Sequence, residues 1–392
     1  MRISLKIVVA LIVLSASFLI FRSNSFVSSV ASNIGNRSLV HALDSGLSSS
    51  LINASEWFDK SINSKPIEDI GCFGRWITWI ELEEMSKAKS LIEENTCNSF
   101  FPQRREVMAY WVLNHADALI NQGLISQADN LYDLGLTLDV FSADMYSGKA
   151  RLYSLWNKPD EAIFYYSEAI KTAPDRTAKY MYKIGLEYFK NNLTDLAKHS
   201  FEKALSAANQ NMESQFYLYD HANSLYLLGQ IAMREGNYVI ANEYYELVRV
   251  VDLDGNTDLP FWSLIRQGEI LETTQNYGLA KQYYLSALEL TNNSVQKSRA
   301  YLALALIYKQ KSQWVQAVKY LQEAINLNPD YDWAYLELAR IWKSQGRCED
   351  AQHVFVKLVE IKSDDEYGQD DLDSFMRSCN PDSLSIERLD PD

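Results

Sequence analysis

The sequence has few of the residues that interrupt helices and few of those that perform catalysis. Its 392 residues include 8 Pro, 15 Gly, 5 His and 4 Cys. No C-x-x-C, H-E-x-x-H or G-x-S-x-G motif occurs, and no glycine-rich phosphate loop is present. These motifs carry most recognisable metal, nucleophile and phosphate sites. We therefore expect a helical protein that is not an enzyme and that binds no metal and no cofactor.

Positive charge is also scarce. The chain carries 37 Lys and Arg against 51 Asp and Glu, which gives a net charge of -14. Much of the excess lies in residues 364–392, which contain ten acidic residues and two basic ones, Arg377 and Arg388. A nucleic-acid-binding protein needs basic patches that contact phosphates. We therefore expect no nucleic-acid partner, and no small-molecule substrate is indicated either.

Long apolar runs are absent except for one near the amino terminus. Ile7 to Phe21 is free of charge and follows Arg2 and Lys6. Its length approaches the roughly 20 residues that span a bilayer, and it also fits the core of a signal peptide. Arg22 follows at once, and the small-x-small triplet Ser29 to Ala31 comes only later. This order favours an uncleaved anchor over a signal peptide.

The amino-terminal segments therefore have predicted roles. We expect residues 1–22 to form a single-pass transmembrane anchor and residues 23–34, rich in Ser and Asn, to form a tether. The slight excess of basic residues before the apolar run favours a cytoplasmic amino terminus. The rest of the chain would then lie outside the cytoplasm.

Residues 143–176 contain a pattern that recurs along most of the chain. Large and small residues stand at helical spacing on both sides of a break at 157–159: Tyr146, Ala150 and Tyr153 before it, and Ala162, Tyr166, Ala169 and Pro174 after it. This spacing predicts two helices joined by a turn. One such hairpin cannot bury both of its apolar faces, so it requires stacked neighbours.

The pattern resembles the tetratricopeptide repeat family in period and in residue types. It returns at 35–68, 69–102, 109–142, 178–211, 222–255, 261–294, 298–331 and 332–365. The resemblance implies an all-α fold, a right-handed α-solenoid of about nine helix-turn-helix repeats. Residues 35–108 would hold degenerate repeats, 109–365 the regular array, and 366–392 an acidic tail with a capping helix near 371–379. The insertion at 212–221 should lengthen the following helix by more than two turns.

The resemblance also implies a partner-binding groove. In that family the first helix of each hairpin lines a concave groove that holds a peptide or a partner helix. Carried over by position, the groove residues are Tyr110, Asp144, Arg151, Tyr182, Phe189, Tyr226, Gln230, Trp262, Arg299, Trp333 and Arg340. Aromatic and Arg side chains tend to dominate binding energy. Some of them could equally fill the inner wall of a tight superhelix.

The four cysteines fall into two local pairs. Cys72 and Cys97 lie within one predicted hairpin, and Cys348 and Cys379 lie in the last repeat and the tail. In an oxidising compartment each pair could form a disulfide. Four reduced cysteines are equally consistent with the sequence.

Together these features predict a membrane-anchored scaffold or adaptor that binds a protein or peptide partner in bacterial cell-envelope assembly. An alternative follows from a resemblance to lipopolysaccharide assembly proteins, in which a short span precedes repeats on the cytoplasmic side. It would make the chain a cytoplasm-facing regulator of envelope biogenesis. Those proteins end in paired C-x-x-C motifs, whereas this chain has only Cys348 and Cys379 there. An enzyme would need perturbed titratable groups that converge in a pocket.

Overall fold

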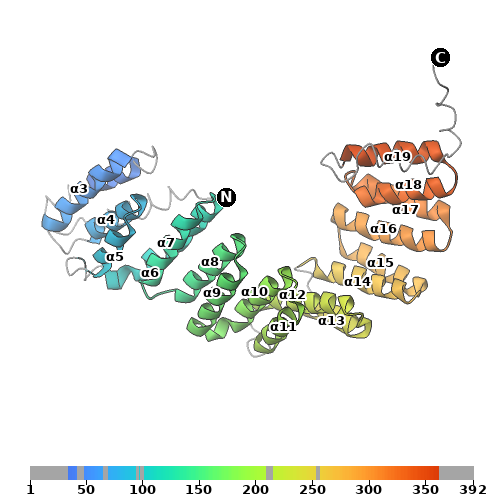
Figure 1. Cartoon of the computed structure of the whole chain (residues 1–392), viewed down its shortest axis with the longest axis horizontal. Helices are drawn as coiled ribbons and strands as arrows, with labels where there is room; N and C mark the ends of the chain where they lie inside the picture. Colours follow the sequence, from blue (N-terminus) through green and yellow to red (C-terminus); the bar gives the residue numbers. More distant parts are fainter. Residues whose placement is uncertain are drawn as a thin grey trace, which may run out of the picture. The chain divides into compact units, whose positions relative to one another are not determined.

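A computed structural model describes residues 34–41, 48–64, 69–93, 97, 101–208, 215–252 and 257–361. Within these ranges the chain is helical, and consecutive helices pair as hairpins (Figure 1). The chain divides into two compact units, residues 1–204 and 205–392. We call them the amino-terminal and the carboxy-terminal unit and describe each by itself.

The amino-terminal unit begins with a helical segment over residues 34–41. Its further helices are α3 (Ser48–Ser64), α4 (Asp69–Glu81), α5 (Met85–Glu93), α6 (Phe101–Asn121), α7 (Ile125–Leu136), α8 (Ser142–Leu155), α9 (Pro159–Thr172), the 3-10 turn η2 (Pro174–Arg176), α10 (Thr177–Lys190) and α11 (Thr194–Ala208). The last turn of α11 crosses into the second unit.

The carboxy-terminal unit continues the same alternation. Its helices are α12 (Gln215–Arg234), α13 (Tyr238–Val251), α14 (Leu259–Thr273), α15 (Tyr277–Leu290), α16 (Ser294–Gln310), α17 (Trp314–Leu327), α18 (Asp332–Ser344) and α19 (Cys348–Ile361). From α4 onward, the even-numbered helices are the first helices of hairpins and the odd-numbered helices are the second. All nine segments predicted to be hairpins contain two helices, so the all-α repeat architecture is confirmed.

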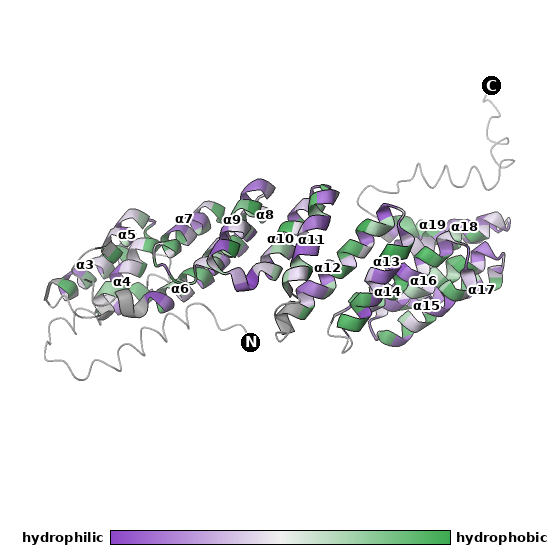
Figure 2. Ribbon diagram, turned by 90° about the horizontal axis from the view of Figure 1, so that it is seen from below, coloured by the Kyte–Doolittle hydropathy of each residue, from purple (hydrophilic) through white to green (hydrophobic). Residues whose placement is uncertain are grey.

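The core of each hairpin combines small and large residues. In α15, Ala280, Tyr284 and Ala287 are completely buried at the predicted spacing. Gly268 on α14 faces the Tyr284 ring so closely that an added Cβ would lie 2.3 Å from Tyr284 Cε1. The small residue thus lets the two helices approach each other. Figure 2 shows apolar and polar residues alternating around the helices, as expected for elements packed on part of their surface.

The turn inside each hairpin has one recurrent geometry. From α4/α5 to α18/α19, one residue of the turn has a left-handed backbone, with φ between 56° and 77°: Glu83, Gly123, Asn157, Asn192, Gly236, Gln275, Ser312 and Gly346. The N–H of the next residue donates to a carbonyl five positions back, as from Asn276 to Leu271 at 2.8 Å. This is a Schellman cap, which satisfies carbonyls at the end of the first helix.

Helices α12 and α6 begin about two turns before their repeats. α12 begins at Gln215, seven residues before Ala222, so the helix is longer by just under two turns, slightly less than predicted. α6 begins at Phe101, eight residues before Ala109, which was not predicted. Pro102 is compatible with the first turn of a helix, and the residues that follow it are mostly good helix formers. The helix therefore extends into the connection that precedes the repeat.

Several predicted segments lie outside the described residues. These are the anchor over 1–22, nearly all of the tether over 23–34, and the tail over 366–392 with its capping helix. Among the helices that are described, none is both long enough and apolar enough to cross a membrane.

The left-handed turns give a first prediction. We expect Gly236→Ala to lower the free energy of unfolding by about 1 kcal/mol, because an L side chain disfavours this conformation. A Cβ at Gly236 would meet nothing within 4 Å, so the cost is purely conformational. Urea unfolding of both proteins measures the difference. The reverse change, Gln275→Gly, is the matched control and should not destabilise; equal stability of Gly236→Ala and wild type would contradict the prediction.

Candidate partner-binding surface

The residues predicted to line the groove all lie on first helices. We call them the first-helix residues. In the amino-terminal unit they are Tyr110 on α6, Asp144 and Arg151 on α8, and Tyr182 and Phe189 on α10. In the carboxy-terminal unit they are Tyr226 and Gln230 on α12, Trp262 on α14, Arg299 on α16, and Trp333 and Arg340 on α18.

Their exposure differs widely. Tyr110 is 60% exposed and Trp333 is 54% exposed, although both are large aromatic residues. Arg151 and Arg340 have half-exposed side chains. Tyr182 is buried. The remaining six residues are partly buried: Asp144, Phe189, Tyr226, Gln230, Trp262 and Arg299.

Tyr182 must be removed from the predicted surface. It is only 5% exposed, and its ring centroid lies 6.1 Å from that of Phe201 on α11. Gly185, one turn later on α10, lies directly against the Phe201 ring, since an added Cβ would come within 2.6 Å of it. The space left by the glycine lets the two rings pack together inside the hairpin. Tyr182 is therefore a core residue, and its aromatic character serves packing.

In the amino-terminal unit the charged first-helix residues form ion pairs with other elements of the unit. Arg151 on α8 pairs with Asp117 on α6, and Asp117 also accepts a hydrogen bond from Tyr132 Oη at 2.8 Å. Asp144 Oδ1 pairs with Arg176 Nη1 of η2 at 2.9 Å. Such exposed pairs contribute little stability. Their main effect is that these charges already have partners within the protein.

The carboxy-terminal unit repeats this arrangement. Arg299 Nη2 on α16 pairs with Glu269 Oε1 on α14 at 2.8 Å. The Glu337 carboxylate on α18 accepts hydrogen bonds from Lys309 Nζ at 2.5 Å and from Arg340 Nη1 at 2.7 Å. Burial alone would raise the pKa of Glu337, but the hydrogen bonds from the two cations lower it below its usual range. Glu337 is therefore ionised in this setting.

These pairings were not predicted, although the sequence holds a signal for them. The partners are separated by about one repeat: Asp117 and Arg151 by 34 residues, Glu269 and Arg299 by 30, and Lys309 and Glu337 by 28. Opposite charges on first helices separated by 28 to 34 residues thus meet across adjacent hairpins. This spacing is a sequence signal for such pairs, but it does not fix which charges pair.

A partly buried polar pair joins the first helices α4 and α6. Glu81 Oε1 at the end of α4 is 3.6 Å from His115 Nε2 on α6, and the His115 ring stacks on Trp111 with centroids 4.6 Å apart. Burial raises the pKa of Glu81 to about 7 and lowers the pKa of His115 to about 4. Near neutral pH, His115 is therefore uncharged and Glu81 is only partly ionised.

This pair gives a prediction about pH. Burial of Glu81 makes stability fall as pH rises from about 4.5 to about 7, since the folded state binds the extra proton. Burial of His115 makes stability rise with pH from about 4 to about 6.5, since the unfolded state binds the extra proton. The two effects largely offset each other. In Glu81→Gln only the His115 effect remains. Between about pH 4 and pH 6.5 the stability of this variant should therefore rise by about 3 kcal/mol more than that of wild type.

Urea unfolding at several pH values, followed by tryptophan fluorescence, measures this difference. Glu161→Gln, at an exposed position on α9, serves as the control and should follow the wild-type pH profile. A Glu81→Gln profile parallel to that of wild type would contradict the prediction.

The structure joins Cys72 and Cys97 in a disulfide with a Cα–Cα distance of 6.1 Å. Both are buried, and the bond ties α4 to the segment that follows α5. Cys348 at the start of α19 is also disulfide-bonded, and Cys379 lies outside the described residues. Within the described ranges, no group of three or more His, Cys, Asp and Glu side chains is placed to hold a metal ion.

A succession of helical hairpins with buried Ala and aromatic residues at fixed spacing defines the class of an all-α repeat solenoid. Three family models, each described as tetratricopeptide repeat, match this chain at residues 143–176 and 263–294, 182–250, and 308–370. Together the matches make up half of the sequence. The chain belongs to the tetratricopeptide repeat family.

Individual relatives are distant. A TPR repeat-containing protein of Methanocaldococcus jannaschii is 21% identical over 216 residues, covering 52% of this chain and 36% of that protein. The chain thus spans little more than a third of that relative's length.

Two solved structures are also only distantly similar to this chain. A tetratricopeptide repeat protein from Parabacteroides merdae has 13% identity and a TM-score of 0.48, with 69% of this chain and 98% of that one covered. Pseudomonas aeruginosa PilF has 18% identity and a TM-score of 0.44, with 57% and 94% covered.

Proposed function

We propose that this chain is a membrane-anchored tetratricopeptide repeat scaffold that binds a protein or peptide partner through its first helices. The observation that carries the proposal is the exposure of Tyr110 and Trp333, which are 60% and 54% accessible on first helices of the two units. Exposed aromatic side chains lose little conformational entropy on binding and supply much apolar area. Each is a natural anchor for an apolar side chain of a partner.

The ion pairs define which partner fits. Arg151 and Arg299 are already paired with acidic residues of neighbouring hairpins. Asp144 is paired with Arg176 of η2, and Arg340 with Glu337 of its own helix. A partner that relied on charge would have to break these pairs and replace them. A segment that presents apolar or aromatic side chains between polar ones can use the aromatic anchors and leave the pairs intact. We therefore propose an amphipathic peptide or helix as the partner.

The proposed location is outside the cytoplasm, in cell-envelope assembly. Two features support it: the apolar run from Ile7 to Phe21, preceded by basic residues, and the disulfide between Cys72 and Cys97. Structural disulfides persist in oxidising compartments and are rare in the cytoplasm. The disulfide speaks against the alternative, a cytoplasm-facing regulator of lipopolysaccharide-type biogenesis.

The anchors provide a test of binding. A photoreactive amino acid placed beside Tyr110 or Trp333 in the full chain should capture the partner in the native membrane. Tyr110→Ala or Trp333→Ala should reduce capture at least tenfold, which corresponds to the loss of about 1.4 kcal/mol or more per anchor. The yield of cross-linked partner, measured by quantitative mass spectrometry, decides the result.

The matched control for these variants is Phe164→Ala. Phe164 is an aromatic residue of α9, a second helix, and is 56% exposed. Its removal should leave capture unchanged. If Phe164→Ala weakened capture as much as Tyr110→Ala did, or if neither first-helix variant weakened it, binding through the first helices would be wrong.

The disulfide provides a test of location. Protein taken from its native membrane without reductant and then denatured should resist thiol labelling at Cys72 and Cys97, and reduction should expose both. A reporter enzyme fused after Asp392 that works only outside the cytoplasm should be active. Labelling of Cys72 and Cys97 before reduction, together with a silent reporter, would instead support the cytoplasm-facing alternative.

A further inference from the structure

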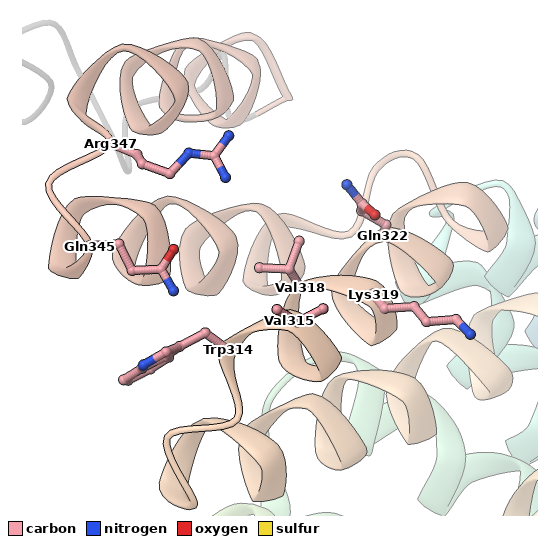
Figure 3. Close-up of a pocket in the computed structure, with 7 residues that line it drawn as sticks. All are labelled: Trp314, Val315, Val318, Lys319, Gln322, Gln345 and Arg347. Carbon is pink, nitrogen blue, oxygen red and sulfur yellow. The ribbon is translucent and has the colours of Figure 1, made fainter.

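A pocket lies on the carboxy-terminal unit, away from the first-helix residues. It has a volume of about 320 Å³ and is lined by Trp314, Val315, Val318, Lys319, Gln322, Gln345 and Arg347. Figure 3 shows the apolar side chains on the beginning of α17, while Gln345 and Arg347 come from the turn between α18 and α19. We call it the α17 pocket. Its walls come from a second helix and a turn, and therefore the pocket is independent of the proposed binding surface.

The lining is apolar at its centre and positive at its edge. Val315 is 81% exposed, which leaves an aliphatic side chain open to solvent beside the half-buried Trp314 and Val318. Lys319 forms no ion pair with the described residues. Arg347 forms an ion pair with Asp350 at 2.7 Å, and its guanidinium lies over the Trp342 ring, 5.1 Å from the centroid. The chemistry suits a ligand that combines aliphatic side chains with carboxylates.

The chain itself carries such a ligand. Residues 380–392, NPDSLSIERLDPD, contain Asp382, Glu387, Asp390 and Asp392 against one Arg388. Leu384 and Ile386 stand two positions apart, so in an extended segment both project from the same side. An extended segment can therefore place two aliphatic side chains on the pocket floor while one of its carboxylates meets Lys319.

Cysteine pairing would tether this segment beside the pocket. Cys348 directly follows Arg347, one of the lining residues, and is disulfide-bonded. Cys72 and Cys97 are bonded to each other, so the cysteine of this sequence that remains to pair with Cys348 within the chain is Cys379. That bond would start residues 380–392 at the rim of the pocket. Thirteen extended residues reach about 40 Å, well beyond the pocket.

We propose that residues 380–392 are an intramolecular ligand of the α17 pocket, held there by a disulfide between Cys348 and Cys379. The tether gives the segment an effective concentration in the millimolar range, so weak apolar and ionic contacts suffice for occupancy. Occupancy would cover Val315 and Trp314 and pair Lys319 with a carboxylate. Reduction of the bond would lower the effective concentration of the segment and weaken its binding.

Photo-crosslinking from within the pocket tests the proposal. The full chain, purified under non-reducing conditions, carries a benzoylphenylalanine in place of Val315, and its cross-links are mapped by mass spectrometry. The dominant product should be an intramolecular link to residues 380–392. Val239 is the matched control, since it is the second residue of α13 as Val315 is of α17, and it is 75% exposed. The link to 380–392 should be at least tenfold weaker from position 239.

Two variants test the parts of the proposal separately. Lys319→Glu, at an exposed position, should lower the Val315 link at least threefold through charge repulsion. Cys379→Ser should lower it at least tenfold by removing the tether, while the Cys72–Cys97 bond stays in place. Links mainly to another molecule, equal links from positions 239 and 315, or a yield that neither variant changes would each overturn the proposal. None of these outcomes bears on capture at Tyr110 or Trp333.

Discussion

The structure depends on one contact: a small residue on the first helix of a hairpin lies against a large residue on the second. Gly268 against Tyr284 and Gly185 against Phe201 are two examples, and in each an added Cβ would collide with the ring. The contact brings the helices close, but it buries only one side of each. The remaining apolar sides must be covered by the adjacent hairpins. The stacking of hairpins in each unit follows from this incomplete burial.

Most of the fold could be predicted because this contact has a local signature. Ala280, Tyr284 and Ala287 fall on one helical stripe, so spacing alone shows that they are buried. The early start of α6 could not be predicted in this way, because residues 101–108 carry no repeat pattern and are helical by propensity. The prediction that Tyr182 lies on the binding surface was wrong for a different reason. Gly185 leaves space for the Phe201 ring, and Tyr182 packs against that ring inside the hairpin.

The candidate binding surface was only partly predictable because exposure depends on neighbours in three dimensions. Arg151 and Arg299 are on first helices as expected, yet each is paired with an acidic residue of the preceding hairpin. A family resemblance assigns positions, but it does not show which charges are already neutralised inside the protein. What remains available for a partner is chiefly aromatic, at Tyr110 and Trp333. Affinity would then come from desolvation of apolar area, and dissolved salt should weaken it little.

The ion pairs between successive first helices have a consequence for the order of the hairpins. The Ala and aromatic contacts are much alike from one hairpin to the next, so packing alone would tolerate exchange of one for another. The ion pairs would not tolerate such an exchange. Moving the α8/α9 hairpin elsewhere would leave Asp117 without Arg151 and bring Arg151 to a neighbour with other groups. Where such pairs occur, complementary charges thus distinguish one junction between hairpins from another, and they favour one linear order of otherwise similar hairpins.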